Sequence, residues 1–281
     1  MPNWRGENAM RLLKLLLILA MCASGPAVAS PLEDGGAAYI KGDYATARRV
    51  WQPLAEKGDA VAQYFLGLMY HHSKGVPQDY AAAMSWYRKA AAQGNAGAQV
   101  ELGVLYANGL GVPQNHATAM SLFRKAAEQG DARAQSNLGA MYANGQSVPQ
   151  DYAEAMSWFR KAANQGDGEA QFELGAMYAN GQSVPQDYAT AVQWYRKAAD
   201  QGNAGGQWGL GFMYATGRGV PQDSVQAHMW LNLAVSRFSS SERQGSEKAI
   251  KARDTVAAKM TPVQIAEAQR LAREWKPKPA R

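Results

Sequence analysis

Apolar residues follow one another at steps of three and four along most of this chain, and this spacing places them on one face of an α-helix. One such helix is predicted after Asp79, where the apolar face is formed by Ala83, Trp86, Tyr87, Ala90 and Ala91. Another is predicted after Asn95, with Ala98, Leu102, Gly103 and Tyr106 on its apolar face. The pattern therefore predicts a pair of amphipathic helices.

The residues around these helices predict where each one begins and ends. Asp79 is a suitable N-cap, and Pro77 stops any helix that precedes it. Gly94 suits the left-handed residue that ends a helix, and Asn95 can cap the next one. Because almost no turn separates the two helices, they are expected to be antiparallel. A glycine followed by aspartate or asparagine recurs at Gly58–Asp59, Gly130–Asp131, Gly166–Asp167 and Gly202–Asn203.

The helix pair is repeated along the chain with a period of 36 residues. The phrase Val-Pro-Gln ends at Gln78, Gln114, Gln150, Gln186 and Gln222. These positions define full units at 43–78, 79–114, 115–150, 151–186 and 187–222, with a half-unit on either side. A single unit cannot bury both of its apolar faces, so the units are expected to stack on their neighbours. The sequence thus predicts an all-α solenoid over residues 30–237.

Two sets of repeated residues indicate how the units pack. A glycine follows a leucine inside the second helix of every unit, although glycine destabilises a helix by about 1 kcal/mol relative to alanine. We expect a neighbouring helix to pass too close for a Cβ at Gly67, Gly103, Gly139, Gly175 and Gly211. Tryptophans lie in or beside one recurring position of the first helix and are predicted to be core residues: Trp51, Trp86, Trp158, Trp194 and Trp230.

The period is lost after residue 238, and the segment 238–281 is predicted to be a helical cap with a basic tail. A helix is expected to run to about Lys259, and Thr261 to Gln264 have the spacing of a capping box with proline at the first helical position. One apolar stripe follows, formed by Ile265, Ala268, Leu271, Ala272 and Trp275. A solenoid needs such an end unit to cover its last apolar face. The alternative for Trp275 and the final Lys-Pro-Lys-Pro-Ala-Arg is a partner-binding tail.

The repeated residues resemble the Sel-1-like repeat, a relative of the tetratricopeptide repeat. The family pattern is followed by the residues Ala98, Leu102, Gly103, Tyr106, Gly109, Gly111, Val112, Asn115, Ala119, Phe123, Ala126, Ala127 and Gly130. The resemblance extends from Asp34 to about Arg237, and Ser147 and Ser183 replace the second loop glycine in two units. It implies a right-handed α/α solenoid of stacked antiparallel helix pairs and a secreted or periplasmic adaptor that binds other proteins.

The N-terminus has the features of a secretory signal peptide over residues 1–29. Arg11 and Lys14 precede a short apolar run, and the small residues that end at Ala29 form a cleavage site. A lipoprotein signal ending at Cys22 is the alternative, but Met21 occupies a position where a small residue is required. Met10 is an alternative start to Met1. We expect a periplasmic or secreted protein with no membrane segment after cleavage.

Cysteine content and charge exclude several classes of function. Cys22 is the only cysteine, so the mature chain is expected to lack disulfides, thiol catalysis and cysteine-based metal sites. The net charge of +6 is unevenly distributed: residues 43–222 carry 14 basic and 14 acidic groups, whereas residues 223–281 carry 11 basic and six acidic groups. An exported protein does not meet the genome, so this excess is not assigned to nucleic-acid binding. A solvated helix face, an anionic envelope surface or an acidic partner accounts for it.

No catalytic arrangement is found in the mature chain. It contains no Ser-x-x-Lys, Gly-x-Ser-x-Gly or P-loop motif. His71 and His72 are adjacent and are expected to point about 100° apart on a helix, which would prevent them from binding one metal ion together. These two histidines, His116 and His228 are assigned structural or surface roles. We therefore expect no enzyme activity, no cofactor and no metal.

Candidate binding residues lie where the units differ from one another. One position of the second helix holds Tyr64, Val100, Ser136, Phe172 and Trp208, while the packing positions around it stay constant. Because the second helices are expected to line the concave face, the large residues of this set are candidate apolar contacts: Tyr64, Phe172 and Trp208. Candidate polar contacts on the same helices are Glu101, Arg133, Asn137, Glu169 and Glu173. The alternative is that this position packs between neighbouring units.

These observations favour an exported, monomeric scaffold that binds a protein or peptide partner on the concave face of the solenoid. One alternative is a periplasmic regulator of a sensor kinase or an envelope complex. Another is a hydrolase acting on peptidoglycan or β-lactams, for which the sequence shows no set of catalytic residues. A purely structural role is the third.

Overall fold

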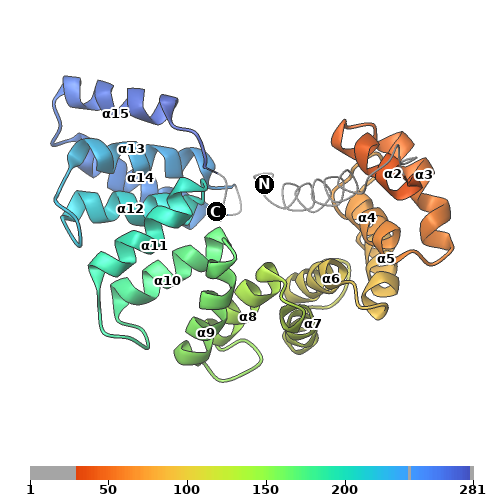
Figure 1. Ribbon diagram of the computed structural model, residues 1–281. Coiled ribbons are helices and arrows are strands. Elements are labelled where there is room, and N and C mark those ends of the chain that lie inside the picture. The colour runs from red at the N-terminus through yellow and green to blue at the C-terminus, as the bar shows by residue number, and fades with distance from the viewer. Residues whose placement is uncertain (1–29, 240–241, 279–281) are drawn as a thin grey trace, which may run out of the picture. The chain divides into compact units, whose positions relative to one another are not determined.

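The computed structural model describes residues 30–239 and 242–278, and this part of the chain contains α-helices and no strand (Figure 1). The predicted signal peptide, residues 1–29, lies outside the described residues. Over the described ranges no helix combines the length and apolar character needed to cross a bilayer. The described chain divides between Ala134 and Gln135 into two compact units.

The N-terminal unit begins with α2 (Pro31–Ile40) and α3 (Tyr44–Glu56), followed by α4 (Ala60–His71) and α5 (Tyr80–Ala92). The next helices are α6 (Ala96–Asn108) and α7 (His116–Glu128), and α8 (Ala132–Asn144) starts in this unit and ends in the next.

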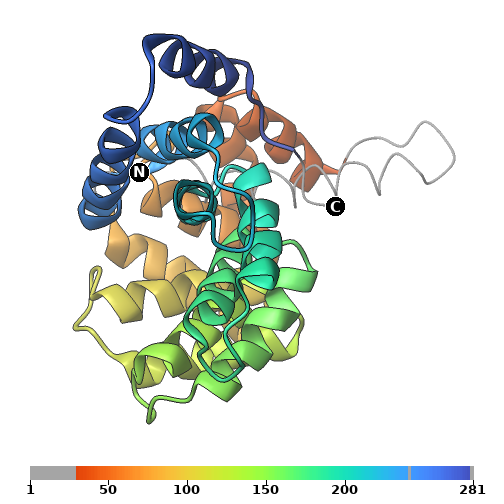
Figure 2. The ribbon, with the colours of Figure 1, turned by 90° about the vertical axis from the view of Figure 1, so that its left-hand side faces the viewer.

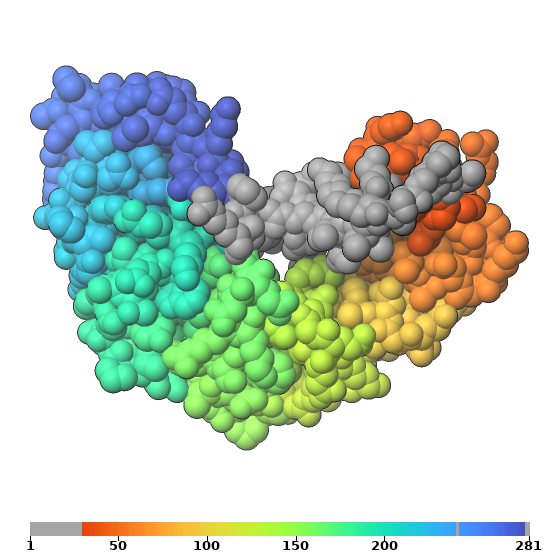
Figure 3. Space-filling model, in the orientation of Figure 1, coloured from red at the N-terminus to blue at the C-terminus, as the bar shows by residue number. Residues whose placement is uncertain are grey.

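The C-terminal unit continues with α9 (Tyr152–Asn164), α10 (Gly168–Asn180), α11 (Tyr188–Asp200) and α12 (Ala204–Thr216). It ends with α13 (Ser224–Arg237), α14 (Arg243–Ala257) and α15 (Pro262–Glu274). Consecutive helices pack against one another from α2 to α7 and from α9 to α14, as the order of colours in the space-filling view also shows (Figure 3). The all-α solenoid of stacked helix pairs is thus confirmed.

The predicted helix ends are confirmed at residue level. The Asp79 carboxylate accepts from Ala82 N at 2.9 Å and caps α5, and the Asn95 side chain accepts from Ala98 N at 2.8 Å and caps α6. Between these two helices Gly94 has φ +87°, a left-handed conformation that glycine adopts without a Cβ clash. These short caps place successive helices side by side.

The repeated glycine inside the second helix has the predicted steric cause. A Cβ built at Gly103 would lie 2.7 Å from the Phe123 ring, and one at Gly139 would lie 2.8 Å from the Phe159 ring. Both distances are shorter than carbon–carbon contacts permit. The aromatic ring of the following helix therefore lies directly on the helix backbone at each glycine.

The prediction that the tryptophans are core residues is wrong for three of them. The core position that faces the repeated glycine is held by Trp51 in the first unit and afterwards by Tyr87, Phe123, Phe159, Tyr195 and Leu231. Trp86, Trp158 and Trp194 lie one residue earlier and are only half-buried. A lysine ammonium lies over each of their rings, 4.2, 3.9 and 4.1 Å from the ring centroid respectively. One residue is 100° on a helix, which turns these rings away from the position that faces the glycine and leaves them partly exposed.

The segment after residue 238 forms the expected end unit. Thr261 and Gln264 make both bonds of a capping box, and Pro262 opens α15. Helices α14 and α15 lie against α13 in both ribbon views (Figure 2). Ala268 and Ala272 of α15 join the same hydrophobic cluster as Trp230.

Candidate functional site

The predicted binding residues of the N-terminal unit form one buried network. Tyr64 is only 5% exposed and packs against Phe65 and Tyr87. Burial raises the pKa of its hydroxyl, and Arg133 hydrogen-bonds to it. Arg133 Nη1 also lies 2.7 Å from Glu101 Oε1 in a salt bridge whose carboxylate is buried. Tyr64 therefore offers little surface to a partner, and one oxygen of Glu101 is bonded to Arg133 inside the unit.

Three of the predicted residues of the C-terminal unit, Phe172, Trp208 and Glu169, line a pocket, and Glu173 does not. Its volume is about 540 Å³. Phe172 and Glu169 of α10, Trp208 of α12 and Phe238 after α13 all contribute to its lining. On the other side it is lined by α14, through Glu242, Arg243, Gln244, Gly245 and Lys248. Asn137, on α8, is half-buried and is not part of this lining.

Two glycines set the positions of the aromatic rings in this pocket. Gly205 lies on α12 against Phe172, and a Cβ there would lie 3.0 Å from the ring. Gly245 lies on α14 against Phe238, where a Cβ would lie 2.8 Å from that ring. Both rings can therefore lie against a helix backbone. The third ring, Trp208, is stacked on Phe212 with centroids 6.0 Å apart.

The polar side of the pocket is organised by Asn203. Its side-chain oxygen accepts from Gly206 N at 2.7 Å and caps α12, while its Nδ2 donates to Glu169 Oε2 at 2.9 Å. Neighbouring groups desolvate the Glu169 carboxyl and raise its pKa, and the nearby charges of Asp167 and Glu242 raise it further, against the effect of the Asn203 hydrogen bond. The Glu169 side chain is thus held in place at the pocket rim.

Glu173 lies one helical turn beyond Glu169 on α10. Burial raises its pKa to about 7, and the negative charge of Glu169 adds to the shift. The pocket has an apolar floor of three aromatic rings and the Glu169 carboxylate on the α10 side, and Glu242, Arg243 and Lys248 line the α14 side. Such a pocket is suited to an apolar side chain flanked by polar or charged groups.

The contribution of the C-terminal segment to this pocket was missed in the sequence. Residues 238–248 were assigned only to the cap, because the period is lost there. Gly245 lies within a helical stretch, where glycine lowers helix stability by about 1 kcal/mol relative to alanine. It is the residue in the sequence that indicates a close contact, which the structure shows to be with the Phe238 ring.

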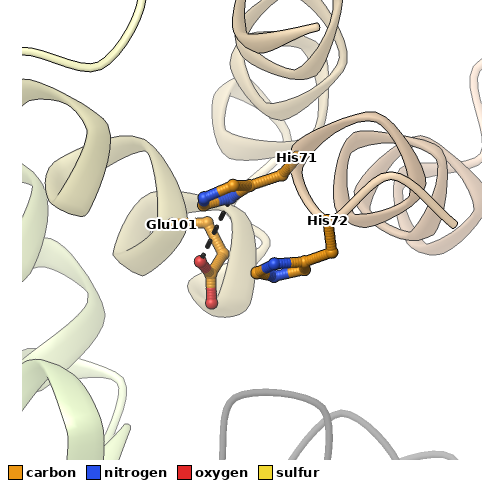
Figure 4. A group of neighbouring side chains, drawn as sticks. All are labelled: His71, His72 and Glu101. Atoms are coloured by element: carbon orange, nitrogen blue, oxygen red, sulfur yellow. Dashed lines mark ion pairs between the residues drawn. The ribbon is translucent and has the colours of Figure 1, made fainter. Parts of the chain in front are cut away.

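The expectation for the adjacent histidines is wrong. His71 is the last residue of α4, but His72 is its C-cap, with φ −105° and ψ 12°, and so departs from helical geometry. The two rings are stacked with centroids 4.3 Å apart and planes 11° apart, and both lie next to the Glu101 carboxylate (Figure 4). The two side chains do not point 100° apart, because His72 has the backbone conformation of a C-cap residue and not that of the helix.

The fold described above, helix pairs stacked in sequence order, is that of an α/α repeat protein. A family model described as Sel1 repeat matches residues 60–95, 96–131, 132–167, 168–203 and 204–237. The chain belongs to the Sel1 repeat family. The family model starts each repeat at the second helix of the units predicted above, with the same period of 36 residues.

Two solved structures support this assignment. A protective antigen of uropathogenic Escherichia coli strains, with an SLR fold, is 35% identical with a TM-score of 0.76 over 87% of this chain and 52% of its own. A Sel1 repeat protein from Oxalobacter formigenes is 32% identical with a TM-score of 0.71 over 87% of this chain and 100% of its own. The chain thus spans about half the length of the first protein. No curated protein matches the chain. Sel1 repeat proteins generally act as protein-interaction scaffolds.

Proposed function

We propose that this protein is an adaptor that holds a protein partner by an apolar side chain inserted into the pocket of the C-terminal unit. The observation that carries the proposal is the convergence of Phe172, Trp208 and Phe238 on one pocket of about 540 Å³. Phe172 and Trp208 occupy the position that varies between otherwise similar repeats. They lie on α10 and α12, which are among the helices expected to line the concave face of the solenoid. The Sel1 repeat fold supports a binding role over a catalytic one.

The charges around the pocket define the partner more closely. Glu169 lines the α10 side of the pocket, and Glu173 lies one helical turn farther along α10, outside the lining. An apolar anchor residue with a basic neighbour in the partner fits this side. Both carboxyl groups have raised pKa values. A bound cation would favour their ionised forms, so the partner would also lower the electrostatic cost of keeping two carboxylates close together.

The proposal is tested by site-specific photo-crosslinking from Gln244, an exposed residue of the pocket lining. A photoreactive amino acid at this position is expected to capture a discrete protein from the native envelope fraction. Phe172→Ala combined with Trp208→Ala should reduce the capture at least tenfold, because two of the three rings of the floor are removed. Tyr64→Ala is a poor variant for this purpose because Tyr64 is a core residue.

The matched control is Trp194→Ala, which removes a half-buried tryptophan of the same unit that does not line the pocket. This variant should retain the capture, and circular dichroism should show the same helicity for all proteins. Equal capture by the double variant, or no discrete product from Gln244 in the native protein, contradicts the proposal. A captured sensor kinase or envelope component would identify the protein as a regulator.

We further propose that the protein is exported and that residues 1–29 are removed. The helix that follows has its N-terminal cap within the proposed mature chain: Ser30 N donates to Glu33 Oε2 at 2.7 Å, and Ser30 is the N-cap of α2. Cleavage after Ala29 would convert this nitrogen to an ammonium group next to a carboxylate. N-terminal sequencing of protein from the envelope fraction should begin at Ser30-Pro31. A chain that starts at Met1 or Met10 in that fraction contradicts export with cleavage.

A further inference from the structure

Three side chains with metal-binding groups meet in the N-terminal unit. His71 and His72 lie at the end of α4, and Glu101 lies on α6 (Figure 4). One ligand atom from each of the three lies within 4.8 Å of the other two, and His71 Nδ1 is 3.8 Å from Glu101 Oε2. His71 and Glu101 are buried, and His72 is half-buried.

His71 and His72 lie at a position where the other repeats share a different sequence. Where the other repeats end the corresponding helix with Ala107-Asn108-Gly109, Ala143-Asn144-Gly145, Ala179-Asn180-Gly181 or Ala215-Thr216-Gly217, this repeat has His71-His72-Ser73. Since four repeats fold with a small and a polar residue here, the histidine pair is not required by the helix ending. The position equivalent to Glu101 holds Phe65, Asn137, Glu173 or Gly209 in the other repeats.

We propose that His71, His72 and Glu101 bind one divalent transition-metal ion, with Zn²⁺ as the ion to test. Two imidazole nitrogens and one carboxylate form a ligand set that suits Zn²⁺ and leaves a fourth position for water or another ligand. With metal–ligand distances near 2.1 Å, tetrahedral ligand atoms are about 3.4 Å apart. Binding therefore requires the three groups to close by about 1 Å and the stacked rings to tilt until their nitrogens point to one ion.

The surroundings of the cluster both support and oppose binding. Arg133 holds Glu101 Oε1 at 2.7 Å, so the other carboxylate oxygen faces His71, and such a partner orients a metal-ligating carboxylate. The Tyr87 hydroxyl lies 3.3 Å from His71 Nδ1 and must give up this contact when an ion takes that nitrogen. The Arg133 charge repels the ion, while Asp131 lies close enough to Arg133 to offset part of that charge.

The test is isothermal titration of ZnCl₂ into the full chain, prepared without a histidine tag, treated with EDTA and exchanged into chelator-free buffer at pH 7.5. We expect one Zn²⁺ per chain with a dissociation constant below about 10 μM and a higher melting temperature with Zn²⁺. At pH 5.5 the affinity should fall at least tenfold, because protons compete for the imidazole nitrogens.

The variants are chosen from the residues of the other repeats, so that the fold is preserved. His71→Ala with His72→Asn restores the Ala-Asn ending and should weaken binding at least tenfold, as should His72→Asn alone. The matched control is His116→Tyr, which places the tyrosine of Tyr80, Tyr152 and Tyr188 at the one repeat that has histidine there. It should bind as the native protein does.

Absence of saturable binding at one ion per chain overturns the proposal, and so does equal affinity of the double variant and the native protein. The cluster belongs to the N-terminal unit, whereas the proposed partner pocket belongs to the C-terminal unit. The failure of either proposal therefore leaves the other intact.

Discussion

Glu173 shows how one residue of the C-terminal unit makes stability depend on pH. Burial and the neighbouring Glu169 raise its folded pKa to about 7 from the ordinary value of 4.5. Between these two values the folded state binds more protons than the unfolded state, so the free energy of unfolding decreases as pH rises. Below about pH 4.5 the carboxyl is protonated in both states and this cost disappears.

Glu173→Gln is therefore expected to stabilise the protein progressively as pH rises. Its advantage over the native protein in the free energy of unfolding should grow by about 1–3 kcal/mol between pH 5 and pH 8, because glutamine carries no titrating proton. Urea denaturation of both proteins at the two pH values measures this difference. An advantage that is the same at pH 5 and pH 8 would show that Glu173 does not titrate in this range.

The candidate site shows what single residues in the sequence could and could not reveal. The variable repeat position predicts Phe172 and Trp208 as contacts, and both line a pocket, but the same position holds Tyr64, which is buried. Helical spacing gives the face on which a residue lies, but not how much of that face its neighbours cover. Phe65 lies next to Tyr64 in the core, whereas Glu173 occupies the equivalent position beside Phe172.

At the scale of elements, buried glutamines connect successive helix pairs. Gln171 Nε2 donates to Ala163 O at 3.2 Å, and Gln201 Nε2 donates to Gln171 Oε1 at 2.8 Å. The same donor and acceptor pair, 30 residues apart, occurs as Gln93–Gln63, Gln129–Gln99 and Gln165–Gln135. Each bond joins the end of a first helix to the second helix of the preceding pair.

Gln171→Ala is expected to lower the free energy of unfolding by about 1–3 kcal/mol, because it leaves buried polar groups without these bonds. Gln146→Ala is the control, since Gln146 is exposed in a loop of the same unit and should change stability by less than about 0.5 kcal/mol. Chemical denaturation of the two variants measures both effects. If Gln171→Ala costs no more than Gln146→Ala, the buried glutamines do not stabilise the stack.

The helices and their ends were predictable, whereas these connections were not. Asp79, Gly94 and Asn95 act locally, within a few residues, so their roles can be read from the sequence. A polar residue such as Gln171 is expected at the surface unless its partner is known. That partner lies 30 residues away, and only the stacking of the pairs brings the two together.

At the scale of the whole molecule, the 36-residue period predicted the solenoid and its C-terminal cap. The division into two compact units between Ala134 and Gln135 was not predicted, because the repeats are equally spaced across it. The histidine cluster was missed for a related reason. Its members belong to different helix pairs, and the position of His72 depends on a helix end that the regular pattern does not specify.

The cap is expected to be essential for the C-terminal unit. Trp230 of α13 meets Trp275 in an edge-to-face contact with centroids 6.0 Å apart, and Arg237 lies 4.5 Å from the Trp275 ring centroid.

A chain ending at Arg237 loses α14 and α15 and exposes this apolar face. Its midpoint of thermal unfolding should be lower than that of the native protein by at least about 5 °C, because the contacts of two helices are lost. It should also self-associate at high concentration. A chain ending at Trp275 keeps both helices and, of the described bonds, loses the exposed ion pair between Lys278 and Asp200 and the bond from Lys278 N to Asp200 O, so its midpoint should change by less than about 2 °C. Thermal unfolding followed by circular dichroism, with light scattering for association, distinguishes the two chains. Equal midpoints would mean that the repeats hold their last face without a cap, contrary to the requirement that stacking imposes on the terminal unit of a solenoid.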